Sequence, residues 1–82
     1  MIIGKVIGTV VSTRKNEMLI GSKFMLVQHL ENGNLVEKYI VAVDSVGAGI
    51  GETVLIALGS AARLALDNRE APVDATIVGI VD

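Results

Sequence analysis

The stretch VAVDSVGAGIGETVL, from Val41 to Leu55, is the most informative part of this 82-residue sequence. Two apolar runs rich in β-branched residues flank a loop in which a glycine stands at every second position, at Gly47, Gly49 and Gly51. Because the chain devotes its most distinctive segment to a loop with little side chain, and few residues to reactive groups, we expect its function to depend on shape and assembly rather than on chemistry.

The composition predicts one small domain, residues 1–82, with more aliphatic surface than its own core can cover. Apolar residues make up 51% of the chain and charged residues only 20%. A chain of this size buries only about 60% of the surface that it exposes when unfolded. We therefore expect part of the apolar surface to be buried against other subunits. With no cysteine, the chain can form neither a disulfide nor a thiolate metal site.

Charge and hydropathy argue against two classes of partner. The net charge of −2 does not favour nucleic acid, whose binding depends on neutralised phosphates. Phe24 and Tyr39 are the only aromatic residues, too few for a base-stacking surface. No run approaches the roughly 20 apolar residues that span a bilayer, and no signal peptide is apparent. We expect a cytoplasmic protein with no nucleic-acid or membrane partner.

Apolar runs bounded by turn residues predict five strands, with a short helix between the fourth and the fifth. Gly4 and Gly8 predict a bend or a close backbone approach in the first strand. Asn32-Gly33 predicts a hairpin. The expected strands are residues 1–13, 18–30 with an interruption near Gly21, 35–43, 52–58 and 75–81, and the expected helix is residues 61–66 with Ser60 as its N-cap.

These elements predict an all-β fold, a small five-stranded OB-like β-barrel. The helix of an OB-fold usually lies between the third and fourth strands, so a later helix is a departure.

The chain also resembles a known family, the vertex proteins of bacterial microcompartment shells, or EutN/CcmL family. The resemblance covers nearly the whole chain in order. It rests on the stretches GKVIGTVVST (residues 4–13), LVQ (26–28), VDSVGAGIGE (43–52), GSAAR (59–63) and PVDATIVGIVD (72–82).

The resemblance implies an OB-like barrel with one short helix and a structural, non-enzymatic function without a cofactor. It implies that five subunits form a pentamer that caps the five-fold vertices of a microcompartment shell in the cytoplasm. Hexameric shell proteins of the facets would be its partners. The short length favours a metabolosome over a carboxysome.

The glycines of the loop admit three interpretations. A phosphate cradle needs a helix directly after the loop, and often a lysine, whereas a strand is expected here. The loop can instead lie at a subunit contact, where bare backbones approach closely, or be an ordinary turn. We favour the subunit contact, and we name Asp44, Gly47, Ala48, Gly49, Gly51, Ser60 and Arg63 as candidate interface or pore residues. A bulky β-branched residue at Gly49 should then disrupt the ring or the fold.

Three other sets of side chains have a structural and a functional interpretation. Asp44 and Glu52 could bind a cation, but two carboxylates are a poor calcium site, so we favour a bond from Asp44 to the amides of its own loop. Arg63 either bridges to a carboxylate of a neighbouring subunit or is solvated. Ser60 with His29 lacks the acidic partner of a catalytic triad, and His29 alone is a poor metal site.

Two further functions remain open from the sequence alone. The chain could be an OB-like binding module or a small non-catalytic subunit of an enzyme complex.

If the chain is a shell protein, the candidate residues for contacts with hexameric neighbours are Lys5, Arg14, Lys15, Glu17, Lys23 and Glu37.

Overall fold

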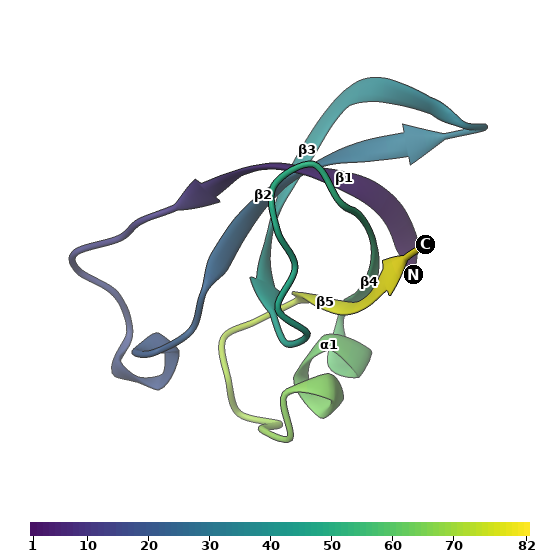
Figure 1. Ribbon diagram of the computed structural model, residues 1–82. Helices are drawn as coiled ribbons and strands as arrows, with labels where there is room; N and C mark the ends of the chain where they lie inside the picture. The colour runs from purple at the N-terminus through teal and green to yellow at the C-terminus, as the bar shows by residue number, and fades with distance from the viewer.

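The computed structural model describes all residues, 1–82, and shows a closed five-stranded barrel (Figure 1). The order of strands around the barrel is β1-β2-β3-β5-β4. All neighbouring strands are antiparallel except β3 and β5, which are parallel. The strands are β1 (Ile2–Val10), β2 (Phe24–Glu31), β3 (Asn34–Asp44), β4 (Thr53–Leu58) and β5 (Ala75–Val81).

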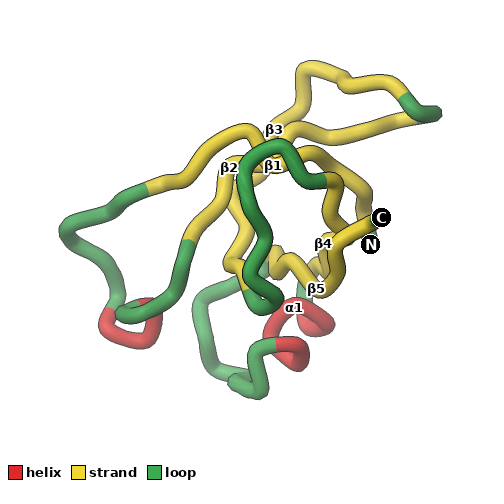
Figure 2. Tube along the Cα trace, viewed as in Figure 1, coloured by secondary structure: helices red, strands yellow, loops and turns green.

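Two short helices lie outside the barrel wall (Figure 2). The α-helix α1 (Ser60–Ala65) connects β4 to β5, and the 3-10 helix η1 (Glu17–Leu19) lies between β1 and β2. The prediction of a small barrel with a helix before the last strand is confirmed. No helix is long and apolar enough to cross a membrane.

Strand β1 closes the barrel because it pairs with β4 near its start and with β2 along most of its length. Its register with β2 shifts between Val6 and Gly8, as expected of a bulge in a strongly curved strand. A Cβ added to Gly4 would clash with Val27 Cγ1 and lie 2.7 Å from the carbonyl oxygen of Gln28. Gly4 therefore permits the close approach of β1 and β2, while Gly8 lies next to the bulge.

Two groups of buried side chains stabilise the fold. The first fills the barrel and comprises Val6, Met25, Val27, Ala42, Ala48, Val54, Ile56, Ala75 and Ile77. The second comprises Val43, Ala62, Ala71 and Val73 and packs α1 and the segment before β5 against the outside of β3. The buried hydroxyl of Thr76 donates to the Ala62 carbonyl at 3.0 Å, which joins α1 to β5.

Two of the expected element assignments are wrong. Met18 does not begin the second strand, because Asn16 accepts a hydrogen bond from the Met18 amide and starts η1 instead. Gly21, with φ of 88°, then turns the chain before β2 begins at Phe24. Ser60 is not the N-cap of α1; that position is Gly59, whose φ is 61°, and no side chain caps the helix.

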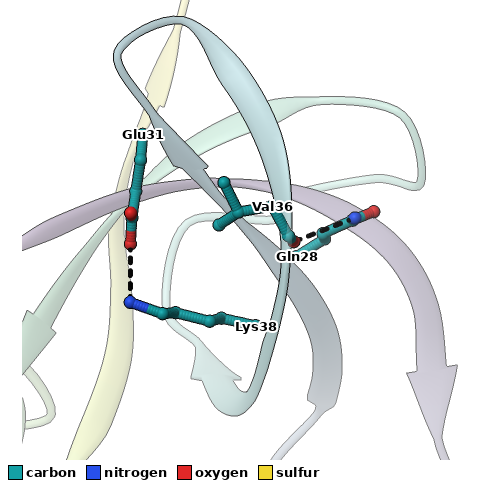
Figure 3. A network of polar contacts seen from close by, with 4 residues as sticks. All are labelled: Gln28, Glu31, Val36 and Lys38. Carbon is teal, nitrogen blue, oxygen red and sulfur yellow. Dashed lines mark hydrogen bonds and ion pairs between the residues drawn. The ribbon is translucent and has the colours of Figure 1, made fainter.

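The β2–β3 hairpin extends beyond the barrel (Figure 1). Asn32 and Gly33 both have positive φ, of 52° and 80°, so the hairpin predicted at Asn32-Gly33 is confirmed. Figure 3 shows two cross-strand contacts on this projection. Gln28 donates through Nε2 to the Val36 carbonyl at 3.0 Å, and Lys38 Nζ lies 3.1 Å from Glu31 Oε2.

The close approach at Gly4 gives a test of the barrel geometry. We expect Gly4→Ala to lower the free energy of unfolding by about 1–3 kcal/mol, because the added methyl meets backbone that cannot move aside. Gly8→Ala is the matched control, since its Cβ would meet nothing within 4 Å. Urea unfolding at one protein concentration measures both. Equal loss of stability in the two variants would contradict this account of β1.

Candidate functional site

The loop between β3 and β4, residues 45–52, is the candidate site, and we call it the glycine loop. The Asp44 carboxylate fixes its first half. Oδ1 accepts from the amides of Val46 and Gly47 at 3.0 and 3.1 Å, and Oδ2 accepts from the Ala48 amide at 2.9 Å. The interpretation of Asp44 as a residue that shapes its own loop is confirmed.

The second half of the glycine loop is attached to its own end and to β1. Glu52 Oε1 accepts from the Gly49 amide at 2.6 Å. The Gly51 amide donates to the Val6 carbonyl at 2.8 Å, and the Val6 amide donates to the Glu52 carbonyl at 3.0 Å. The loop is thus bound along its length and passes in front of the barrel in the view of Figure 1.

Ala48 has a role that the sequence did not indicate. Its side chain is only 1% exposed and belongs to the core that fills the barrel. The glycine loop therefore contributes one small side chain, that of Ala48, to the core inside the barrel. Val46 and Ile50, in contrast, are 41% and 66% exposed. These two apolar residues, which were not among the sequence candidates, form the outer surface of the loop.

The three glycines of the loop do not have equivalent backbones. Gly47 and Gly51 have φ values of 80° and 92°, a region that strains any residue with a Cβ. Gly49 does not, and a Cβ there would lie 3.3 Å from Glu52 Oε1, the far end of a flexible side chain. The fold therefore requires glycine most strictly at Gly47 and Gly51, and the expectation that Gly49 is needed for a ring stays a prediction.

Neither a phosphate nor a metal ion finds free ligands in the glycine loop. The amides of Val46, Gly47, Ala48 and Gly49 already donate to protein carboxylates, so they are not available to a phosphate. A strand, β4, follows the loop, as expected. Nowhere in the chain do three His, Asp or Glu side chains gather in a way that could hold a metal ion.

The other candidates lie on or near α1. Arg63 is half-buried and donates through Nη1 to the Val73 carbonyl at 3.0 Å, a bond within the subunit that neither sequence interpretation included. Ser60 is exposed in the first turn of α1. His29 lies in β2 at its register shift with β3, and its imidazole makes no hydrogen bond with a carboxylate. The structure thus assembles no catalytic group from these residues.

Comparison with known proteins identifies a family of the same fold. The family model "Ethanolamine utilisation protein EutN/carboxysome" matches residues 1–82. The chain belongs to the EutN/CcmL family.

Relatives in this family carry names that describe shell assembly. The carboxysome shell vertex protein CcmL of Nostoc sp. PCC 7120 is 57% identical, over 100% of this chain and 83% of that protein. The structure of Gloeobacter violaceus CcmL has a TM-score of 0.95 at 47% identity, covering 100% of this chain and 86% of that one. The pentameric microcompartment shell protein GrpN of Rhodospirillum rubrum has a TM-score of 0.88 at 48% identity, covering 100% and 93%.

The predicted function, a structural and non-enzymatic one at the vertices of a microcompartment shell, is confirmed by these relatives. The preference for a metabolosome stays a prediction, because one group of relatives is named for carboxysomes and GrpN only for a microcompartment. The interface or pore roles of the seven candidate residues also stay predictions.

Because three loop amides donate to the Asp44 carboxylate, the contribution of Asp44 to stability and to the order of the loop can be measured. We expect Asp44→Ala to lower the free energy of unfolding by about 1–3 kcal/mol and to speed amide hydrogen exchange at Val46, Gly47 and Ala48, since all three amides lose their acceptor. Asp74→Ala removes the same charge from an exposed carboxylate without a hydrogen bond, and should have little effect. Similar exchange rates in both variants would show that Asp44 does not hold the loop.

Proposed function

We propose that five copies of this chain form a closed ring that caps a shell vertex, with hexameric shell proteins around it. The observation that carries the proposal is that apolar side chains are exposed on two separate faces of one small barrel. The pentameric relative GrpN supports the number five.

The first face lies on the outside of β1, β4 and β5. Ile3 pairs with Leu55, and Leu55 pairs with Gly79, so the three stand in one row across the sheet. Ile3 is 44% exposed, and Leu55 and Gly79 are half-buried. Because Gly79 has no side chain, the outer surface of the sheet is lower at that end of the row. We call this row the Ile3 face.

The second face lies on the outside of β2 and β3. Leu26 pairs with Val41 in one row, and Gln28 pairs with Tyr39 in the next. Val41 and Tyr39 are about half exposed. Met25 and Val27, which alternate with these residues along β2, point into the barrel. We call this surface the Val41 face.

Two different apolar faces suit a ring rather than a symmetric dimer. A cyclic assembly joins one patch of each subunit to a different patch of the next, and it closes when the rotation per subunit is correct. Contact between the Ile3 face of one copy and the Val41 face of the next would cover both. In this arrangement, association would stabilise a folded subunit that exposes many aliphatic residues.

The glycine loop and α1 take part in the proposed ring in different ways. Val46 and Ile50 offer apolar contact area to a neighbouring subunit. Asp44, Gly47, Gly49 and Gly51 hold those two side chains in place, and Ala48 anchors the loop to the core. Ser60 and Arg63 lie outside the barrel wall, where a neighbour or a central pore can reach them.

The connection between β1 and β2 is the surface that we assign to hexameric neighbours. It extends away from the barrel (Figure 1). Arg14, Lys15, Glu17 and Lys23 lie on it and are all exposed, which gives it a net positive charge. Lys15 and Lys23 line a surface cavity of about 290 Å³ with Thr9, Val10, Val11, Ser12, Ser22 and Phe24. Of the other candidates, Lys5 lies in β1 and Glu37 on the projecting hairpin.

The ring is tested by placing a charge on each face in turn. We expect Ile3→Lys and Val41→Lys each to yield monomers by native mass spectrometry, because a buried unpaired charge opposes association. A mixture of the two variants should yield heterodimers, since each retains the face that the other lacks. Val11→Lys, a change at an 86% exposed apolar residue on neither face, should leave the pentamer intact.

The mixture distinguishes the proposed contact from its alternatives. A face that binds its own copy would let one of the single variants form homodimers. Pentamers in both single variants would show that the ring uses other surfaces, and a monomeric wild type would contradict the proposal altogether.

The positive charge of the β1–β2 connection gives a second test. We expect Lys23→Glu to form normal rings but to co-assemble less well with a hexameric shell protein from the same microcompartment, measured by co-sedimentation. Lys38→Glu, which reverses a charge on the projecting hairpin and breaks only an exposed ion pair, is the control. Loss of co-assembly in the control alone would assign the contact to the hairpin instead.

A further inference from the structure

A cavity beside α1 brings two arginines together without an acidic partner. Its volume is about 300 Å³, and its walls are Ser60, Arg63, Leu64 and Arg69. This cavity lies apart from the Ile3 and Val41 faces, which are on strands β1 to β5.

The cavity exists because the chain reverses direction directly after α1. Asp67 has a φ of 55°, and the Asn68 amide donates to the Arg63 carbonyl at 3.1 Å. This turn brings Arg69 back to the surface that Ser60 and Arg63 present from the helix. Figure 1 shows the sharp turn between α1 and the segment that leads to β5. The turn thus places two arginines, six residues apart in the sequence, on the wall of one cavity.

Neither arginine is neutralised by the protein. The one ion pair in the chain joins Lys38 to Glu31 on the distant hairpin. Asp67, Glu70 and Asp74 are near in sequence, yet none forms an ion pair with Arg63 or Arg69. The bond from Arg63 Nη1 to the Val73 carbonyl fixes that guanidinium and leaves its other N–H groups without a partner in the protein.

We propose that this cavity binds an oxyanion of the size of a carboxylate group or an inorganic phosphate. A guanidinium donates two parallel hydrogen bonds to such a group, and a second guanidinium adds charge. The Ser60 hydroxyl is a further donor, and Leu64 supplies the apolar part of the wall. The attraction comes from the side chains, because a helix of six residues has too few aligned peptides to contribute much.

The anion has two possible sources with the same chemistry. One is a small oxyanion from solution. The other is a carboxylate side chain of an adjacent chain in the shell, and this source rests on the proposed ring. If the anion comes from solution, added anion can enter the cavity in the assembled protein. If a carboxylate of a neighbouring chain occupies the cavity, added anion is excluded from it in the assembled protein.

The binding test follows the side-chain Nε–Hε signals of arginine by NMR while sodium acetate or sodium phosphate replaces sodium chloride at constant ionic strength. We expect saturable shifts of the Arg63 and Arg69 signals in the wild-type protein. Arg69→Gln should weaken binding about tenfold or more, since a charge-assisted hydrogen bond is lost. Arg14→Gln removes the same charge from the β1–β2 connection and should leave the affinity unchanged.

The same titration on assembled and dissociated protein separates the two sources. Equal binding in wild-type rings and in the Ile3→Lys monomer indicates an anion from solution. Binding in the monomer alone, together with weaker rings or weaker co-assembly in Arg69→Gln, indicates a carboxylate from a neighbour. Absence of saturable shifts in both forms, or equal loss of binding in Arg69→Gln and Arg14→Gln, would overturn the proposal. Ring formation is measured separately by native mass spectrometry, so its failure would not be confused with failure of anion binding.

Discussion

Closure of the barrel depends on the short parallel pairing of β3 with β5. Only Val43 with Thr76 and Asp44 with Ile77 are in register there, whereas each antiparallel neighbour shares a longer ladder. Ser45 extends this pairing, because both its amide and its hydroxyl donate to the Ile77 carbonyl, at 3.4 and 2.6 Å. A closed barrel removes open sheet edges, which would otherwise pair with other chains in unwanted registers.

The site residues follow from this constraint. Where β3 ends at its pairing with β5, Asp44 turns the chain, and the glycine loop crosses to β4 with Ala48 facing the core. On the other side of the same pairing, Thr76 binds the Ala62 carbonyl and positions α1. The loop and the helix are therefore both fixed to the part of the barrel wall that has the shortest ladder. Residues that define the outer surface of the loop therefore have a fixed orientation, as the proposed ring would require of a contact between subunits.

Features set by local sequence were predictable, and features set by tertiary contacts were not. The hairpin at Asn32-Gly33 needs positive φ at both residues, which this pair supplies by itself. The apolar run at 18–20 was assigned to a strand because short apolar runs do not distinguish strand from helix, and the cap from Asn16 decided otherwise. The inward position of Ala48 depends on the barrel that surrounds it. The cavity with Arg63 and Arg69 likewise depends on the turn at Asp67, where positive φ is unusual for a residue other than glycine.

The size of the barrel explains why so much apolar surface faces outward. The core that fills the barrel holds only nine buried apolar side chains, and three of them are alanines. Because a five-stranded barrel encloses so small an interior, many of the other Val, Ile and Leu side chains lie on the outside. Polar residues at those positions would make a more soluble monomer without disturbing the core. Their aliphatic character is therefore explained by contacts between subunits, and the high apolar fraction of this short chain reflects its assembly more than its own folding.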